Sequence, residues 1–500
     1  MDYAAVQTVL PDGAGVPTEL KLEVAIKTGI PEFHVTGIPP SRARSLSDRV
    51  LCALQMHGIR LNHRTLTLNV EGDPDPRLLE LLDLPVAVVL LQSMGYFMPA
   101  LPRDRHVCLG KLSLDGQIRI LEAPGRILAA ADYLEVPYLV SHFPETIFGI
   151  PTGTQPIQLG SLNALFAKHE SEYRRTPLFR NRQWEPRRLN FDQVFRPYSW
   201  KALRAAVAAA GARHSLLCLG PPGSGKTVLA HCIYEVLPAP DIWEAKEIYL
   251  RSSESDGEIL RRPFRRPHHS LTRVAMIGGG TPIRSGEVSE ANHGMLLLDE
   301  LGEFRRDVLQ SLREPLDSQQ VHIARGIHRR ILPCAFWFIA TANACPCGMA
   351  GSRDFVCRCS PSSVRQYQAR MLGALQDRMD MELFLESDSE AVSLELAEEW
   401  YFNLIEAQRN RSGGKLLFNS EIQDLDSFCV FEGGVQSRFE KDTEGLSHRK
   451  KHRIRRLARS IADMSGAAWI QMEHLLEALR YTSAWNFISQ ENAKAPSRSD

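Results

Sequence analysis

The chain has 500 residues, of which 44% are hydrophobic and 24% are charged, and its 59 basic residues balance 59 acidic ones. This is the composition of a globular protein with length for about three domains. The zero net charge excludes a nucleic-acid binder that relies on overall basicity, and the lack of a long apolar run or a signal peptide predicts a cytoplasmic protein outside the membrane.

The first part of the chain is predicted to be an α/β domain over residues 1–165. Short runs at 20–25 and 65–70 have the apolar pattern of strands. The apolar run 83–91 is predicted to be a buried segment opened by a proline. The polar, arginine-rich stretch 166–188 then predicts a linker to the rest of the chain.

A phosphate-binding loop follows the predicted linker. The apolar residues 215–219 predict a buried strand before it, and the spacing of apolar residues after it predicts a helix. The loop between them reads Gly220-Pro221-Pro222-Gly223-Ser224-Gly225-Lys226-Thr227 and fits the pattern G-x-x-x-x-G-K-[ST]. Backbone N–H groups of such a loop bind phosphate, Lys226 would contact the β- and γ-phosphates of ATP, and the Thr227 hydroxyl would bind Mg²⁺.

An acidic pair supplies the second half of an ATPase site. Residues 295–298 are apolar and predict an internal strand of a parallel sheet, which ends at Asp299 and Glu300. In this position Asp299 would face Mg²⁺ and Glu300 would orient the attacking water. The alternative is a buried strand that merely ends in an acidic turn. The order of the motifs, with the acidic pair behind the phosphate loop, favours the ATPase.

A second apolar strand is predicted at 335–340, and it runs into Thr341, Ala342 and Asn343. Asn343 would then lie beside the acidic pair and hydrogen-bond the water or the γ-phosphate. The alternative is that Asn343 only caps a turn.

Two cysteine pairs follow this strand, at Cys345-x-Cys347 and Cys357-x-Cys359. Four thiolates on one loop could hold a tetrahedral Zn²⁺ ion. The spacing within each pair is tighter than in most zinc sites, so four reduced cysteines near a turn are the alternative. Ten cysteines in a chain of this length predict reduced thiols in any case.

The C-terminal part is predicted to be helical, with helices at 390–408, 449–464 and 471–481. We therefore divide the rest of the chain into an ATPase core at 189–385 and a helical lid and tail at 386–500. The helix that begins near Arg449 has Ile454, Leu457, Ala458 and Ile461 on one face. Its basic residues Lys450, Lys451, Arg453, Arg455 and Arg456 are expected to face solvent as a positive stripe.

Further strings in the second half of the chain carry a family resemblance. They read Arg262-Pro263-Phe264-Arg265-Arg266-Pro267-His268-His269, Asp299-Glu300-Leu301-Gly302-Glu303-Phe304, Ala342-Asn343-Ala344-Cys345-Pro346-Cys347-Gly348 and Gln376-Asp377-Arg378-Met379-Asp380. Together they resemble the magnesium-chelatase-like branch of the AAA+ ATPases, the branch of the ComM-type competence proteins. The first part of the chain looks like the Lon-protease-like domain of that family, through 35–39 and 83–85. No serine stands at the expected nucleophile position in 83–87, which disfavours proteolysis.

The resemblance implies roles for arginines that the residues alone leave open. Arg378 looks like an arginine finger that reaches a neighbouring subunit, and Arg449 looks like the lid arginine called sensor 2. A surface ion pair with Asp377 or Asp380 is the alternative for Arg378, and a place in a solvated basic face is the alternative for Arg449. The resemblance also places the segment of Arg262, Arg265 and Arg266 beside a central pore, in contact with DNA phosphates, with a buried packing motif as the alternative.

The resemblance implies a ring, expected to be a homohexamer, in which ATP hydrolysis with Mg²⁺ drives work on single-stranded or branched DNA. Two alternatives stay open: a chelatase-type motor that acts on a protein partner, and a slow nucleotide-dependent switch. One segment departs from the family pattern. Residues 194–200 stand where the family usually carries a Gly-Gln pair that helps to seat the base, so base recognition is expected to be altered.

Overall fold

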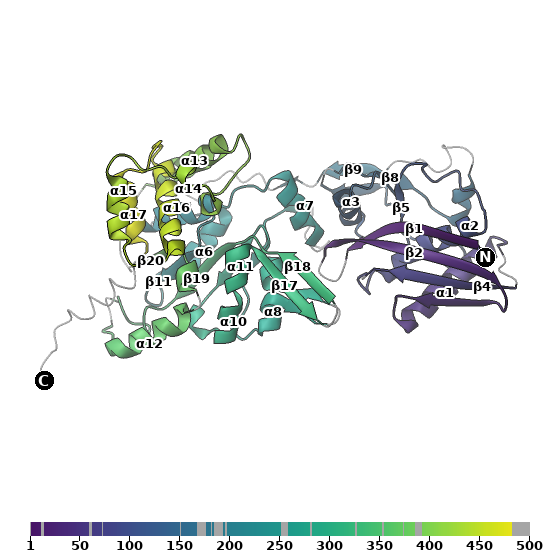
Figure 1. Cartoon of the computed structure of the whole chain (residues 1–500), viewed down its shortest axis with the longest axis horizontal. Coiled ribbons are helices and arrows are strands. Elements are labelled where there is room, and N and C mark those ends of the chain that lie inside the picture. The colour runs from purple at the N-terminus through teal and green to yellow at the C-terminus, as the bar shows by residue number, and fades with distance from the viewer. Residues whose placement is uncertain are drawn as a thin grey trace, which may run out of the picture. The chain divides into compact units, whose positions relative to one another are not determined.

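The computed structural model shows two compact units, which are described separately (Figure 1). The N-terminal unit contains Met1–Glu185, Ile242–Arg261 and Pro282–Arg284, and the remaining residues form the phosphate-loop unit. The described residues are 2–11, 15–59, 63–72, 74–150, 152–167, 177–181, 183–184, 194–195, 198–251, 259–280, 283–325, 328–352, 355–373, 375–385 and 393–482. Most of the predicted linker at 166–188 and the tail after 482 lie outside them.

The N-terminal unit is built on a four-stranded sheet. Its strands, in sheet order, are β1 (Asp2–Pro11), β2 (Pro17–Thr28), β4 (Arg64–Glu71) and β3 (Glu32–Thr36). The first three pair antiparallel and β3 is parallel to β4. Alternate residues of β2 are buried, including Leu20, Leu22 and Val24, so one face of this sheet covers a core. The strands predicted at 20–25 and 65–70 are confirmed.

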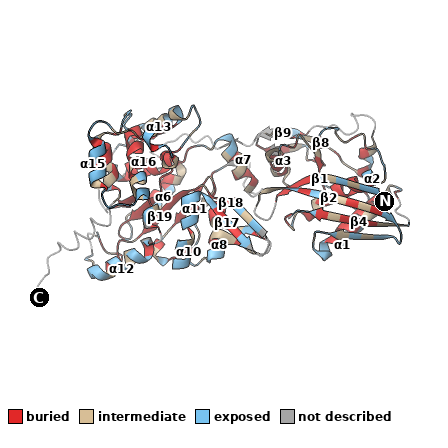
Figure 2. Ribbon diagram, in the orientation of Figure 1, coloured by how far each residue is buried: buried red, intermediate tan, exposed pale blue. Residues whose placement is uncertain are grey.

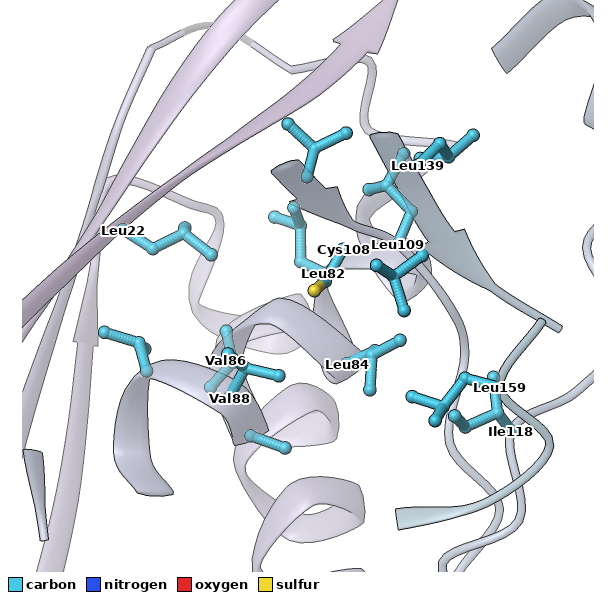
Figure 3. Close-up of a cluster of buried hydrophobic side chains, with 14 of the residues drawn as sticks. Leu22, Leu82, Leu84, Val86, Val88, Cys108, Leu109, Ile118, Leu139 and Leu159 are labelled. Carbon is cyan, nitrogen blue, oxygen red and sulfur yellow. The ribbon is translucent and has the colours of Figure 1, made fainter. Parts of the chain in front are cut away.

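A second group of short strands and three helices completes the core of this unit. The strands are β5 (His106–Cys108), β6 (Tyr138–Ser141), β7 (Thr146–Gly149), β8 (Gln155–Gln158) and β9 (Leu178–Asn181). The helices are α1 (Pro40–Met56), α2 (Asp83–Ser93) and α3 (Pro124–Tyr133). Figure 3 shows side chains of β2, α2 and β6 gathered around Cys108. The buried segment predicted at 83–91 is therefore a core helix.

A piece of chain from beyond the phosphate loop also packs in the N-terminal unit. It consists of α7 (Ile242–Arg251) and β12 (Ile259–Leu260), and β12 pairs with β10 (Gln183–Trp184). Lys246 on α7 forms an ion pair with Asp132, and Trp243 stacks on Tyr133 with ring centroids 5.4 Å apart. The sequence-based boundaries place this piece in the ATPase core, whereas its contacts lie with α3.

The phosphate-loop unit is built on a five-stranded parallel sheet. Its strands, in sheet order, are β13 (Phe264–Arg265), β16 (Met295–Leu298), β19 (Trp337–Ala342), β11 (Leu216–Leu219) and β20 (Met381–Phe384). Every residue of β11, β16 and β19 is buried, as expected where helices cover both faces of a parallel sheet (Figure 2). Because all five strands run the same way, their carboxyl ends meet at one edge.

Helices and one hairpin surround this sheet. The helices are α5 (Trp200–Ala212), α6 (Lys226–Glu235), α8 (Arg273–Ile277), α9 (Glu287–Glu290), α10 (Arg306–Ser311), α11 (Arg313–Ser318) and α12 (Pro361–Leu372). The hairpin is formed by β17 (Gln320–Arg325) and β18 (His328–Pro333). The Ser199 side chain caps α5 by accepting the N–H of Ala202 at 3.3 Å, which fixes where this helix begins.

Five α-helices form the lid at the C-terminal end of the described chain, where Figure 1 labels them. They are α13 (Leu394–Arg411), α14 (Leu425–Phe428), α15 (Val435–Asp442), α16 (His448–Met464) and α17 (Met472–Arg480). The lid shares a core with α5, and the Gln408 amide donates to the Gly211 carbonyl at 2.8 Å. The predicted α/β fold with C-terminal helices is confirmed. Among the described residues, no helix has the length and apolar character needed to span a bilayer.

Candidate nucleotide site

The phosphate loop connects β11 to α6. Gly223 and Gly225 have φ angles of +79° and +86°, a left-handed conformation that glycine adopts without strain, and Gly225 caps the start of α6. The Lys226 ammonium donates to the carbonyls of Gly220 and Pro221 at 2.9 and 2.7 Å, so the loop wraps around it. The loop therefore has the backbone of a phosphate cradle.

Tyr198 lies against this loop and was missed by the sequence analysis. Its hydroxyl donates to the Gly225 carbonyl at 3.1 Å. Tyr198 belongs to the segment 194–200 that departs from the family pattern. Within that segment this tyrosine fixes the last turn of the phosphate loop, a role that no local spacing rule indicates.

Asp299 leaves the carboxyl end of β16 and reaches the phosphate loop. Its Oδ1 accepts the Thr227 hydroxyl at 3.0 Å and also the Thr341 hydroxyl. Burial raises the pKa of Asp299, but these hydroxyls and the nearby Arg266 outweigh burial, and the net pKa is lower than usual. An ionised carboxylate beside a threonine hydroxyl fits Mg²⁺, so Thr227 and Asp299 would hold the ion.

Glu300 follows Asp299 with its side chain exposed and its backbone in the left-handed region, at φ 56°. A non-glycine residue in this conformation is strained by about 1 kcal/mol, and such strain is common at functional sites. The Glu300 N–H donates to the Thr341 hydroxyl at 3.1 Å. Thr341 therefore holds both members of the acidic pair. The only signal for it in the sequence is a hydroxyl inside an otherwise apolar strand.

Asn343 lies directly after β19, at the same edge of the sheet as the phosphate loop. A Cβ atom on Gly348 would lie 3.5 Å from Pro222 Cγ and 3.7 Å from the Asn343 side-chain nitrogen, so the loop after β19 meets both residues. The structure thus brings together the phosphate loop, the acidic pair and Asn343. The four cysteines named in the sequence analysis also lie together on this loop.

Each of the three arginines assigned to a pore has partners within its own unit. Arg262 is buried and donates to the carbonyls of Pro238 and His293 at 2.7 and 2.6 Å, so its expected contact with DNA phosphates is wrong. Arg265 forms a two-point ion pair with Glu287 at 2.7 and 2.8 Å.

Arg266 forms an ion pair with Asp299 in the nucleotide site itself. Its guanidinium donates a hydrogen bond to Asp299 Oδ2, while the hydroxyls of Thr227 and Thr341 donate to Oδ1. The sequence gives no signal for this pair, because the two residues stand far apart in the chain, where Arg266 follows β13 and Asp299 follows β16. Arg266 is therefore paired with Asp299 and is not part of a free basic cluster.

Arg378 and Arg449 both form ion pairs with the carboxylate of Asp317. Arg378 Nη2 is 2.6 Å from Asp317 Oδ2, and Arg449 Nη1 is 3.0 Å from Asp317 Oδ1. The partner of Arg378 is thus neither Asp377 nor Asp380 among the contacts that the structure describes. Both arginines line a cavity of about 530 Å³, together with Arg453, Arg456 and His452. Asp317, Asp380 and Glu421 also line this cavity, so its five arginines exceed its carboxylates by two. This net positive lining suits an anionic group such as a phosphate.

This cavity lies at the opposite edge of the sheet from the phosphate loop. Ser215, which precedes β11, donates its hydroxyl to the Arg378 carbonyl at 3.0 Å, whereas the phosphate loop follows the same strand. The residues from Ser215 to Gly220 span roughly 16 Å in an extended strand, farther than an arginine side chain reaches. Neither arginine can therefore contact phosphates held by the loop of its own subunit in this conformation.

Three arginines of the basic stripe expected on α16 have partners within the same unit. Arg453 is 2.7 Å from Asp380, Arg455 is 2.8 Å from Asp426, and Arg456 donates to the Ile422 carbonyl at 2.7 Å. Burial raises the pKa of Asp380, but Arg453 and His214 beside it hold the pKa well below its usual range. The predicted apolar face of this helix is confirmed, because all four of its members are buried. The solvent-facing placement of these three arginines is wrong, since they bind carboxylates and carbonyls of the same unit.

A buried parallel sheet that carries a phosphate loop, an acidic pair and a polar strand end at one edge, with a helical lid, defines a P-loop protein of the AAA+ type. Comparison with known families agrees. “Magnesium chelatase, subunit ChlI” matches residues 198–392, “Subunit ChlI of Mg-chelatase” matches 22–139, and “Magnesium chelatase, subunit ChlI C-terminal” matches 402–482.

Individual relatives extend this match to nearly the whole chain. The chain is 30% identical to uncharacterized protein YifB of Salmonella typhimurium, over 96% of this chain and 97% of YifB. It is 29% identical to competence protein ComM of Haemophilus influenzae, again over 96% of this chain and 97% of the relative. The chain therefore belongs to the magnesium-chelatase-like family that includes YifB and ComM.

Proposed function

We propose that the protein is a Mg²⁺-dependent ATPase that works as a ring motor on DNA. The observation that carries the proposal is the separation of two charged sites on one sheet. The phosphate loop, Asp299 and Glu300 occupy the carboxyl edge, and the arginine pair on Asp317 occupies the amino edge. A site divided in this way becomes complete only when one subunit presents its arginines to the nucleotide of the next.

The roles of the residues follow from their positions. The backbone of 220–225 and Lys226 would bind the phosphates of ATP, and Thr227 and Asp299 would hold Mg²⁺, which neutralises the charge that develops on the phosphates. Glu300 would accept a proton from water and orient that water, and Asn343 would bind the water or the γ-phosphate. Arg378 and Arg449 would neutralise charge on the nucleotide of a neighbouring subunit.

A closed ring is the assembly expected when each nucleotide site takes residues from two neighbouring subunits. An interface that places the amino edge of one subunit against the carboxyl edge of the next is head-to-tail, and head-to-tail contacts close into rings when the rotation permits. A homohexamer is the size that the family resemblance implies. Sedimentation or mass photometry of the protein with ATP and Mg²⁺ measures this size directly.

DNA is the proposed substrate, because a relative of nearly equal length is named a competence protein. Single-stranded and forked DNA are expected to raise the ATP hydrolysis rate several-fold. Binding is expected to weaken steeply between 50 and about 200 mM salt, because each neutralised phosphate releases a counterion. Steady-state ATPase assays and fluorescence anisotropy at several salt concentrations measure both effects, with blunt duplex DNA of the same length as the control.

A chelatase-type motor that acts on a protein partner is the second candidate, favoured by the match to magnesium chelatase subunit ChlI. If neither form of DNA binds at low salt or changes the ATPase rate, the DNA motor is wrong and this second candidate is preferred. A slow regulatory switch is disfavoured by Glu300, since nucleotide binding alone does not need that carboxylate.

Replacing Arg266 with alanine is expected to lower the Mg²⁺ concentration that supports half-maximal binding of a fluorescent ATP analogue by about fivefold. Arg266 must leave Asp299 before the ion approaches, and a partly exposed ion pair of this kind contributes about 1 kcal/mol. Arg265→Ala is the matched control, because the neighbouring Arg265 pairs with Glu287 instead. An unchanged or higher Mg²⁺ requirement in Arg266→Ala would show that Arg266 does not compete with the ion.

A further inference from the structure

Four cysteines converge on the loop that joins β19 to α12. Cys345 and Cys347 follow β19, and Cys357 and Cys359 precede α12. The Cys345 and Cys347 sulfurs are 3.4 Å apart, those of Cys347 and Cys357 are 3.7 Å apart, and those of Cys357 and Cys345 are 3.6 Å apart. All four sulfurs lie within 4.8 Å of one another. They therefore form one cluster rather than two separate pairs.

These separations match a single tetrahedral metal ion. Zinc–sulfur bonds of about 2.3 Å in a tetrahedron place neighbouring sulfurs about 3.8 Å apart. A cluster of two or four irons would hold cysteines on different irons farther apart, because the four thiolates would be divided among several metal atoms. Thiolates are soft ligands, and an all-sulfur tetrahedral set selects Zn²⁺ over the hard ions Mg²⁺ and Ca²⁺. We propose that Cys345, Cys347, Cys357 and Cys359 bind one structural Zn²⁺ ion.

The backbone explains why the tight Cys-x-Cys spacing is compatible with this site. Gly348 has a φ angle of +81°, and its N–H donates to the Cys345 carbonyl at 3.0 Å, which closes a turn over Cys347. The N–H of Ala350 donates to the Cys345 sulfur at 3.3 Å. Hydrogen bonds of this kind orient a metal-binding thiolate and stabilise its charge. The turn thus presents both sulfurs of the first pair on one side.

The position of the cluster connects the metal to the nucleotide site. Gly348 stands in this turn beside Pro222 of the phosphate loop and Asn343. A metal that holds the turn in shape would therefore keep the phosphate loop and the end of β19 in contact. Loss of the ion is expected to weaken ATP binding several-fold. This expected loss of ATP binding rests on the proposed ATPase function. The proposal that the cysteines bind zinc does not depend on that function.

The test is elemental analysis of full-length protein purified without chelator or added metal. Wild-type protein is expected to contain about one zinc per chain. The double variant Cys357→Ser, Cys359→Ser is expected to lose at least nine-tenths of it, because two ligands remain of four. Cys52→Ser is the matched control, since Cys52 lies on α1 of the N-terminal unit and is not a member of the cluster, and it is expected to keep the full zinc content.

A second measurement on wild-type protein does not depend on the folding of any variant. Exchange of the ion for Co²⁺ is expected to give the intense visible absorption of a tetrahedral cobalt tetrathiolate. Less than a tenth of a zinc per chain in folded wild-type protein, or full zinc in the double variant, would overturn the site. If the wild-type protein contains about one zinc per chain and its ATP affinity is unchanged after the zinc is removed, the zinc site is supported. The proposed link between that site and the phosphate loop is then wrong.

Discussion

Replacing Glu300 with glutamine is expected to leave ATP binding intact and to lower the rate of ATP hydrolysis by about 100-fold or more. The amide keeps the size of the side chain but cannot accept the proton of the attacking water. The phosphate loop and the proposed Mg²⁺ ligands Thr227 and Asp299 are unchanged, so affinity for ATP should persist. Phosphate release under steady-state conditions measures the rate, and anisotropy of a fluorescent ATP analogue measures the affinity.

Glu303→Gln is the matched control for this variant. Glu303 is an exposed glutamate on the same acidic segment, three residues further along, and its replacement removes the same charge. Its hydrolysis rate is expected to stay within about twofold of wild type, as for most exposed surface substitutions. Near-normal turnover in Glu300→Gln would show that another group orients the water.

The second large effect is expected at Arg378. Arg378→Ala protein should bind ATP but hydrolyse it about 10³-fold more slowly, which is the usual effect of removing an arginine finger. The reason is geometric, because Arg378 lies at the amino edge of the sheet, and we propose that it acts on the nucleotide of the neighbouring subunit. Lys226→Ala protein should also be inactive in ATP hydrolysis, but for the opposite reason, since it loses the phosphate contact in its own nucleotide site.

Mixing these two inactive proteins should restore part of the activity. In rings assembled at random from equal amounts, about a quarter of the interfaces pair an intact phosphate loop with an intact arginine. Arg370→Ala is the control, because Arg370 is exposed on α12 and is expected to leave the rate unchanged. Absence of rescue in rings whose mixed composition has been verified would contradict a role of Arg378 between subunits.

The sequence by itself determined the parts of the site that are local in the chain. The phosphate loop needs only a strand, a glycine-rich turn and a helix start in succession, and all three are encoded between Leu216 and Glu235. The acidic pair is equally local, because a run of apolar residues predicts a buried strand and its last residue fixes where Asp299 emerges. The buried face of α16 follows from helical spacing alone.

The tertiary structure decided which partner each charged side chain meets. Arg266 pairs with Asp299, Arg378 and Arg449 share Asp317, and Arg262 lies buried. Local spacing in the sequence indicates neither Asp299 nor Asp317 as a partner of these arginines. The physical reason is that a long, flexible guanidinium pairs with whatever carboxylate the packing of distant elements brings within reach. Periodicity encodes which face of an element is buried, but it carries no information about the element packed against that face.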